Sequence, residues 1–294
     1  MKIGVTFPQS DLELNAADTR IWAEAVEDLG FDHILFYDHV LGADRSTRPG
    51  WSGFHDMDDR FHEVMVLMGY LAAVTSRVEL VTGVVALPQR QTALVAKQAA
   101  EVDHLSGGRL RLGVGIGAND VEYQALGKVF ENRGRRIEEQ IELLRQLWTM
   151  PVVDFDGQWE QVVSAGINPL PIQQPIPLWI GSSHDRTIER VARLADGWLP
   201  ETRVLTEARR QIPLLHSHLA DHGRDHASFG LQGRLSLKDG DKDYWGEALS
   251  TWSELGATHF SVSTIWFGVE TLSEHIGLLE DVVEEFGAAM AGTP

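Results

Sequence analysis

The stretch that decides the fold, residues 78–119, reads VELVTGVVALPQRQTALVAKQAAEVDHLSGGRLRLGVGIGAN. Its first part, Val78–Leu87, is rich in β-branched side chains and predicts a buried strand. Thr92 is suited to cap the amphipathic helix that follows, and Gly107 is suited to end it. Leu110–Val114 predicts a second strand. A strand, a helix and a strand in this order predict two parallel strands joined by a right-handed crossover.

The same alternation continues through the rest of the 294 residues. Further strands are predicted at Lys2–Phe7, His33–His39, Leu178–Ile180, Gly197–Leu199, Phe229–Leu237 and His259–Ile265. Eight strands alternating with helices predict an α/β fold, a (β/α)₈ TIM barrel formed by one domain over residues 1–294. A doubly wound parallel sheet is the alternative fold. The proline-rich stretch Pro151–Pro177, with a turn signal at Asp156-Gly157, is interpreted as an insertion.

Composition narrows the classes of partner. The formal net charge of −18 disfavours nucleic acid and anionic membranes and leaves small molecules as the expected ligands. The absence of cysteine excludes disulfides, thiolate nucleophiles and cysteine metal sites. The chain starts without a signal-peptide apolar core, and no apolar run is long enough to span a bilayer, so we expect a cytoplasmic protein. The GxSxG, Walker A and HExxH motifs do not occur, so hydrolase and kinase chemistry has no support.

In a (β/α)₈ barrel the active site lies where the strands end. Asp38 and His39 end the second predicted strand, and an unperturbed histidine, which titrates near pH 6.5, suits proton transfer. The alternative is a half-buried histidine that is hydrogen-bonded to Asp38 and has no catalytic role. The turn Gly181–Ser183 leads from a strand into a helix, and such turns bind anions through free N–H groups and the helix dipole. Alternatively, Ser183 or Asp185 only caps that helix.

Other residues near the predicted mouth favour a ligand site. Gly113, Gly115 and Gly117 leave room for a planar ring beside the backbone, whereas their GxGxG spacing disfavours a dinucleotide motif. Aromatic residues that could wall an apolar pocket, or belong to the core, are Trp51, Phe54, Trp198, Trp266 and Phe267, of which Trp51, Trp198 and Trp266 are the predicted substrate contacts. His55–Glu63 collects metal-ligand residue types in an order that matches no known ligand spacing, so we expect an exposed loop and no metal.

Three groups of motifs lie along the chain. They are ILFYDH at 34–39; AKQAA at 96–100 with DHLSGGRLRLGVGIG at 103–117; and PLWIGSS at 177–183 with ADGW at 195–198. Together they resemble the bacterial luciferase-like family of flavin and deazaflavin oxidoreductases, over nearly the full length. The resemblance implies a (β/α)₈ barrel with an insertion after the fourth helix, and a homodimer formed through helices that flank the early strands.

The Tyr-Asp-His ending of the second strand resembles the branch of this family that uses coenzyme F420, a 5-deazaflavin. Members that use FMN more often carry Glu-His there. The resemblance implies that His39 exchanges a proton with the substrate, that Asp38 lies against the deazaflavin ring, and that a cis peptide bond at Gly83–Val84 supports the ring. The implied cofactor contacts are Asp38, Thr82, Gly83, Val84, Ile116, Gly117 and Asn119, with Gly181, Ser182 and Ser183 at the cofactor phosphate.

The first hypothesis is therefore an F420-dependent oxidoreductase that transfers a hydride between C5 of the deazaflavin and a small organic substrate, with His39 as proton donor or acceptor. One alternative is an FMN-dependent monooxygenase of the same fold. A second is a non-catalytic flavin- or deazaflavin-binding barrel. The sugar-phosphate dehydrogenases of the branch carry a glutamate directly after GxGxG, where this chain has Ala118, so glucose-6-phosphate dehydrogenase activity is not expected.

Overall fold

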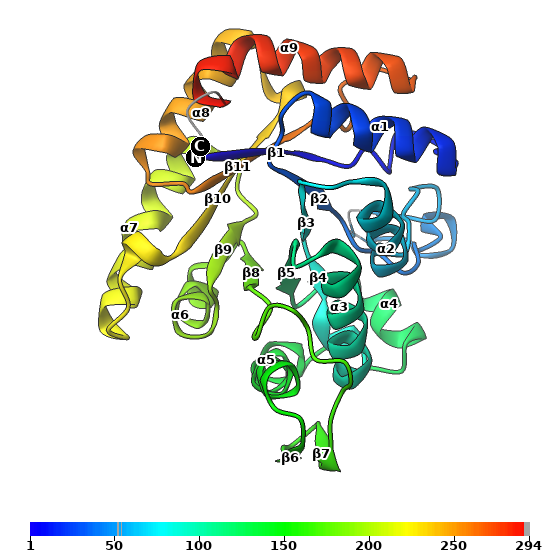
Figure 1. Ribbon diagram of the computed structural model, residues 1–294, viewed down its shortest axis with the longest axis vertical. Coiled ribbons are helices and arrows are strands. Elements are labelled where there is room, and N and C mark those ends of the chain that lie inside the picture. The colour runs from blue at the N-terminus through cyan, green and yellow to red at the C-terminus, as the bar shows by residue number, and fades with distance from the viewer. Residues whose placement is uncertain (52, 54, 291–294) are drawn as a thin grey trace.

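The computed structural model describes residues 1–51, 53 and 55–290 (Figure 1). Within these residues, eight parallel strands are hydrogen-bonded in the order β3-β2-β1-β11-β10-β9-β8-β5, and a pairing of β3 with β5 closes the ring. The strands are β1 (Lys2–Thr6), β2 (His33–Phe36), β3 (Glu79–Thr82), β5 (Leu110–Gly115), β8 (Leu178–Ser182), β9 (Gly197–Pro200), β10 (Gly230–Ser236) and β11 (His259–Ser263). The predicted (β/α)₈ barrel is confirmed, and the alternative doubly wound sheet is wrong because an open sheet has two unpaired edges.

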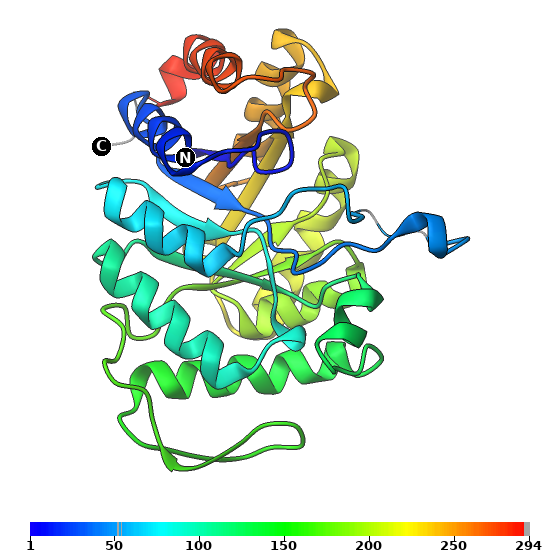
Figure 2. The ribbon, with the colours of Figure 1, turned by 90° about the vertical axis from the view of Figure 1, so that its right-hand side faces the viewer.

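Helices surround the ring of strands in both ribbon views (Figures 1 and 2). They are α1 (Ala16–Asp28), α2 (Val64–Val74), α3 (Thr92–Ser106), α4 (Asp120–Ala125), α5 (Arg133–Thr149), α6 (Asp185–Leu194), α7 (Leu205–Asp221), α8 (Lys242–Glu254) and α9 (Leu272–Met290). None of the helices in the described part of the chain has the length and apolar character needed to cross a membrane.

The stretch at residues 78–119 folds as the predicted β-α-β unit with two differences. The first strand is interrupted: β3 ends at Thr82, the Gly83–Val84 peptide is cis, and a short strand β4 (Val85–Ala86) pairs separately with β5. The cap of α3 is also different, because the N-cap is Gln91 and Thr92 is already helical. Its hydroxyl instead accepts a hydrogen bond of 2.9 Å from Gln140 on α5.

The proline-rich insertion follows α5 and contains the predicted hairpin. Strands β6 (Val153–Asp156) and β7 (Gln161–Ala165) are antiparallel and flank the turn that begins at Gly157. The hairpin lies at the bottom of Figure 1, away from the ring of strands. It therefore adds to the outside of the barrel and leaves the strand ends open.

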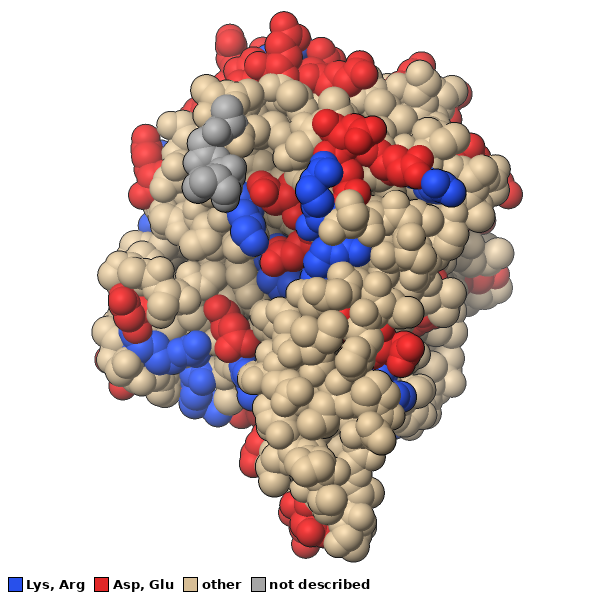
Figure 3. Space-filling model, viewed as in Figure 1, with Lys and Arg blue, Asp and Glu red and all other residues tan. Residues whose placement is uncertain are grey.

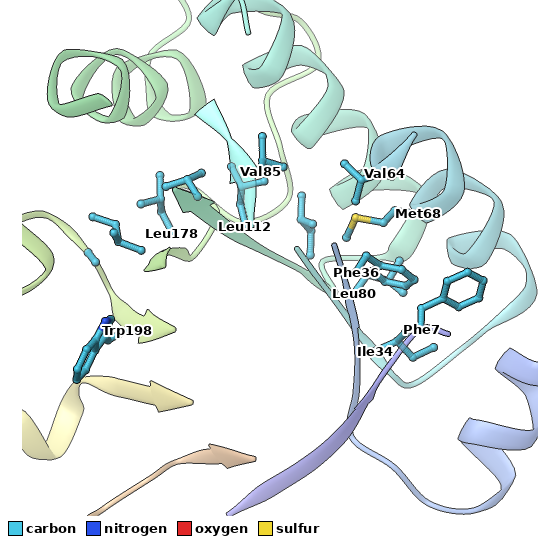
Figure 4. Packing of buried hydrophobic residues seen from close by; sticks show 14 of the residues in the cluster. Phe7, Ile34, Phe36, Val64, Met68, Leu80, Val85, Leu112, Leu178 and Trp198 are labelled. Carbon is cyan, nitrogen blue, oxygen red and sulfur yellow. The ribbon is translucent and has the colours of Figure 1, made fainter. Parts of the chain in front are cut away.

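Two apolar clusters occupy the two sides of the strands. The larger one fills the space between strands and helices; Figure 4 shows Ile34 and Phe36 of β2 near Val64 and Met68 of α2. The smaller one, formed by Leu35, Trp179 and Leu199, involves the alternate residues of β2, β8 and β9, so it lies inside the ring. It separates a polar layer at the start of the strands from a cavity at their ends.

Candidate active site

A cavity of about 510 Å³ lies at the carboxyl ends of the barrel strands. Figure 2 shows the strands running across the view, with the loop after β2 extending beyond their carboxyl ends at the right. Of the residues predicted to form the site, the cavity is lined by Asp38, His39, Trp51, Gly83, Val84, Ile116, Gly117, Asn119, Gly181, Ser182, Ser183 and Trp266. The structure thus brings together side chains from six segments that are distant in sequence.

His39 is held by a carboxylate that the sequence analysis missed. Its Nδ1 lies 3.1 Å from Oε1 of Glu122, whose side chain is only 2% exposed. Glu122 also accepts hydrogen bonds from the Val40 N–H and from Nε2 of Gln89. Burial acts to raise the pKa of Glu122, but these hydrogen bonds together outweigh it, so the net pKa is lowered and the residue is ionised at neutral pH.

Glu122 lies on α4, a helix of six residues that hydrophobic periodicity did not reveal. The residue in the sequence that could have revealed α4 is Asn119, which caps this helix by accepting a 3.0 Å hydrogen bond from the Val121 N–H. An asparagine followed three residues later by glutamate resembles a capping box. Here the glutamate bonds to His39 and not to its own helix. Asn119 lines the cavity and also donates to the Leu41 carbonyl, so it ties the β2 loop to α4.

The carboxylate of Asp38 is not hydrogen-bonded to His39, so the alternative named the wrong partner for a histidine that is half-buried and bonded to Glu122. Asp38 accepts a 2.7 Å hydrogen bond from Nη2 of Arg90 and a 3.3 Å hydrogen bond from the Ala86 N–H. Burial raises the pKa of Asp38, and the charge of Arg90 opposes this rise. Asp38 therefore fastens β4 and the segment after it to the end of β2, and its side chain is only 1% exposed.

Val84 forms part of the cavity wall because glycines on β5 and β8 make room for it. A Cβ atom on Gly115 would lie 2.6 Å from Cγ2 of Val84, and one on Gly181 would lie 2.7 Å from Cγ1. Gly113 does not line the cavity, because Thr82 and Leu199 lie against it, whereas Gly115 and Gly117 do line it beside Val84. Thr82 is fully buried and bonds to Gly113 through its hydroxyl, so it does not line the cavity.

The opposite rim of the cavity is formed by the turn from β8 into α6. Gly181, Ser182 and Ser183 line the cavity together with Thr187 and Arg190 of α6. The hydroxyl groups of Ser182 and Thr187 are hydrogen-bonded to each other. No side chain caps the first N–H groups of α6, so the proposed capping by Ser183 or Asp185 is wrong. Uncapped N–H groups, hydroxyls and an arginine form a suitable cradle for an anion.

The aromatic residues divide between the cavity and the core. Trp51 and Trp266 line the cavity, and Trp266 has a positive φ of 61°. Trp198 is fully buried in the outer apolar cluster, which corrects its predicted contact with substrate. Its neighbour Leu199 lies inside the ring, so Trp198 points outward, as Figure 4 shows. Phe267 is 38% exposed and does not line the cavity, and Phe54 lies outside the described residues.

A (β/α)₈ barrel with a cavity at the carboxyl ends of its strands has the architecture in which small-molecule sites of such barrels occur. Residues 3–289 match the luciferase-like monooxygenase family, and the chain belongs to that family.

Relatives by sequence include proteins of Mycobacterium tuberculosis. One uncharacterised protein is 41% identical over 139 residues, which is 47% of this chain and 48% of the relative, so the match spans about half of its length. Another is 33% identical over 80% of this chain and 83% of the relative. A third, named as a coenzyme F420-dependent oxidoreductase, is 29% identical over 67% of this chain and 52% of the relative.

Solved structures share the fold. A monooxygenase of Streptomyces bottropensis has a TM-score of 0.81 and 19% identity, over 98% of this chain and 99% of that one. An F420-dependent secondary alcohol dehydrogenase, in complex with an F420–acetone adduct, has a TM-score of 0.79 and 15% identity, over 97% and 98% of the two chains. At these identities the likeness concerns the fold alone.

Proposed function

We propose that this protein is a coenzyme F420-dependent oxidoreductase in which His39 donates or accepts the proton that accompanies hydride transfer. The observation that carries the proposal is the half-buried His39 at the cavity wall, with Nδ1 bonded to the buried carboxylate of Glu122. This bond orients the imidazole and leaves Nε2 available to a substrate. The name of the relative that is 29% identical gives further support to F420.

The residues of the cavity fit a deazaflavin nucleotide-like cofactor. The anion cradle formed by Ser182, Ser183 and the N-terminus of α6 would hold its phosphate. Val84 and the backbone of residues 115–117 would form an apolar wall against its ring. When bound, the deazaflavin supplies hydride transfer at C5. The protein's own contribution is to orient ring and substrate, to exclude water and to hold one proton at His39.

FMN-dependent monooxygenase chemistry is the second candidate, because the cradle suits the phosphate of either cofactor. Fluorescence titration of the protein with F420 and, separately, with FMN tests the choice. We expect micromolar or tighter binding of F420 and binding of FMN at least tenfold weaker. Preferential binding of FMN, together with oxygen consumption by the reduced flavin complex, would support the monooxygenase instead. Tight binding of F420 without turnover on any substrate would support the non-catalytic alternative.

The role of His39 is tested by His39→Ala with reduced F420 and the best substrate from a panel of carbonyl compounds and activated alkenes. We expect turnover to fall by about 100-fold or more, as for loss of a positioned acid–base group. The dissociation constant of F420 should change less than threefold.

His55→Asn is the matched control. The His55 ring lies 4.7 Å from that of His39 and also lines the cavity. Burial and the neighbouring His39 lower the pKa of His55, so it is a poor proton donor at neutral pH. This control should keep turnover within threefold of the wild type. Unchanged turnover in His39→Ala would exclude the proposed role.

A further inference from the structure

Four arginines line the cavity within the described part of the chain, and they differ in how their charge is balanced. Arg190 donates a 2.7 Å hydrogen bond to Glu138, and Arg203 lies 3.2 Å from Asp239. For Arg133 and Arg234, no carboxylate of a described residue lies within ion-pair distance. A cation without an acidic partner at a ligand cavity is suited to an anionic ligand.

The two arginines without an acidic partner lie on different elements and have different contacts. Arg133 begins α5, donates a 2.9 Å hydrogen bond to the Phe130 carbonyl and lies 3.6 Å from the centre of the Phe130 ring. Arg234 lies on β10 and donates a 2.7 Å hydrogen bond to the hydroxyl of Tyr37. Tyr37 precedes His39 by two residues. Arg234 is therefore an anion-binding group on the His39 side of the cavity.

The surroundings of Arg234 favour an anion of single charge. Ser236 and Ser263 line the same cavity, whereas the hydroxyl of Ser261 is engaged by His33 and Gln232. Because the Tyr37 oxygen accepts the hydrogen bond from Arg234, its own hydrogen remains available to a ligand. The cavity-lining carboxylates are already engaged or lie at the rim: Asp38 pairs with Arg90, Glu122 bonds to His39, and Glu201 is exposed. One guanidinium with hydroxyl donors matches a carboxylate, which carries one negative charge and accepts two parallel N–H bonds.

We propose that Arg234 and Tyr37 bind the carboxylate of the substrate, so that the substrate class is an organic acid whose reacting carbon lies toward His39. The inference rests on the proposed function for the identity of the reaction. The carboxylate-binding site does not depend on that reaction, because it is formed by the side chains of Arg234 and Tyr37.

The test compares benzoate with benzamide, which have nearly the same shape and differ in charge. Dissociation constants are measured by ligand-observed NMR on the F420-saturated protein and on the protein without F420. We expect benzoate to bind at least tenfold more tightly than benzamide to the F420-saturated protein. Arg234→Gln should remove that preference while changing the dissociation constant of F420 less than threefold. Tyr37→Phe, which keeps the ring and removes one donor, should weaken benzoate about three- to tenfold.

Arg203→Gln is the matched control, because Arg203 lines the same cavity but is already paired with Asp239. It should retain the preference for benzoate. Equal binding of the two probes by the wild type, or an unchanged preference in both Arg234→Gln and Tyr37→Phe, overturns the proposal. A tenfold loss of F420 binding in Arg234→Gln with benzoate binding intact would assign Arg234 to the cofactor. If the wild type binds no F420, the proposed function fails, and the measurements without F420 still decide the carboxylate site.

Discussion

At the scale of single residues, the chemistry of the site depends on which partner holds each titratable group. His39 and Asp38 are adjacent in sequence, yet their side chains have different partners. His39 bonds to Glu122, 83 residues away, and Asp38 bonds to Arg90, 52 residues away. Both residues lie beyond β2, which ends at Phe36, and both line the cavity, but closure of the barrel brings a different partner to each side chain. His39 is thereby free to face a ligand while Asp38 fastens the barrel rim.

Replacing Glu122 tests whether the orientation of His39 matters. Glu122→Gln keeps the shape and an acceptor for the Val40 N–H but removes the negative charge beside the imidazole. We expect kcat to fall on the order of 10- to 100-fold, within the range that a positioned acid–base group contributes. The KM and the dissociation constant of F420 should change less than threefold, and Glu122→Asp should recover part of kcat. Steady-state kinetics and F420 titration measure both quantities.

The control for this prediction is Glu201→Gln. Glu201 lines the same cavity but is exposed, and no histidine of a described residue lies within ion-pair distance of it. The kcat of Glu201→Gln should match that of the wild type. A Glu122→Gln variant with normal kcat would show that Glu122 only supports the fold.

At the scale of elements, the cavity wall is produced by packing between β4, β5 and β8. The chain leaves the pairing of β3 after Thr82 and enters β4, and this detour pushes Val84 toward the barrel axis. Glycines at 115 and 181 accept the two methyl groups of Val84, one on each side. The position of the wall is therefore set by the complementarity of one β-branched residue with two residues that lack a Cβ atom.

Adding a methyl group at this contact should displace Val84. In Gly115→Ala, the new Cβ would lie 2.6 Å from Cγ2 of Val84, so side chain or backbone must shift. We expect the free energy of unfolding to fall by about 1–3 kcal/mol, as is typical of overpacking, and F420 affinity to fall with it. Urea unfolding and cofactor titration measure the two effects.

The double variant Gly115→Ala with Val84→Ala separates overpacking from other causes. Removing the two methyl groups should recover more than half of the lost stability, which is the non-additivity expected of residues in contact. Gly277→Ala is the control, because a Cβ there has no heavy atom within 4 Å and lies in α9. Gly277→Ala should leave the free energy of unfolding unchanged or raise it, since alanine has a higher helix propensity than glycine. Additive losses in the double variant would contradict the packing explanation.

At the scale of the whole molecule, the barrel keeps a buried polar layer at the start of its strands. His33 bonds to Ser261, which also accepts from Gln232, and Gln232 accepts from Arg111. Arg111 lies 4.2 Å from the centre of the Trp179 ring and 3.0 Å from Glu79. Figure 3 shows this face of the molecule, with acidic and basic side chains intermingled near its middle. The layer links strands from around the ring through one network.

Acid should weaken this layer. Burial, and then the charge of Arg111, lowers the pKa of His259 to about 2 and that of His33 well below its usual value. In the unfolded chain both would titrate near pH 6.5, so below that pH the unfolded state binds more protons. The contribution of these two neutral histidines to the free energy of unfolding is therefore fully present above pH 6.5 and is lost as the pH falls below that value. Each histidine contributes a slope of up to about 1.4 kcal/mol per pH unit.

Urea unfolding between pH 7.5 and pH 5 measures that slope. His259→Gln should reduce it by the contribution of one histidine. His226→Gln, in which the replaced side chain is 62% exposed, should leave the slope unchanged. A free energy of unfolding that stays constant over this range would show that the two buried histidines take up protons in the folded state.

Several parts of the fold and the site could be predicted because their signals are local. The eight strands, the βαβ unit, the hairpin at Asp156-Gly157 and the passage from strand to helix after Ser182 all follow from periodicity or turn chemistry within short windows. The cis peptide bond at Gly83–Val84, implied by the family resemblance, is confirmed, whereas the separate strand β4 and the short helix α4 were missed, since neither is long enough to show a period. Trp198 was wrongly predicted to contact the substrate. Side chains alternate along a strand, so one of two neighbouring residues points into the barrel, but the alternation does not say which one.

The alternation of strands and helices, the (β/α)₈ class and the residue types at the strand ends can all be predicted from the amino-acid sequence, because each depends on neighbours within one turn or one strand. Which side chains contact one another is set by the folding of the whole chain. Folding assigned Glu122 to His39, Arg90 to Asp38 and Arg234 to Tyr37, and it turned Trp198 away from the cavity. The physical reason is closure of the ring. Register and strand order bring together side chains that lie 52 to 197 residues apart, and no local pattern encodes that pairing.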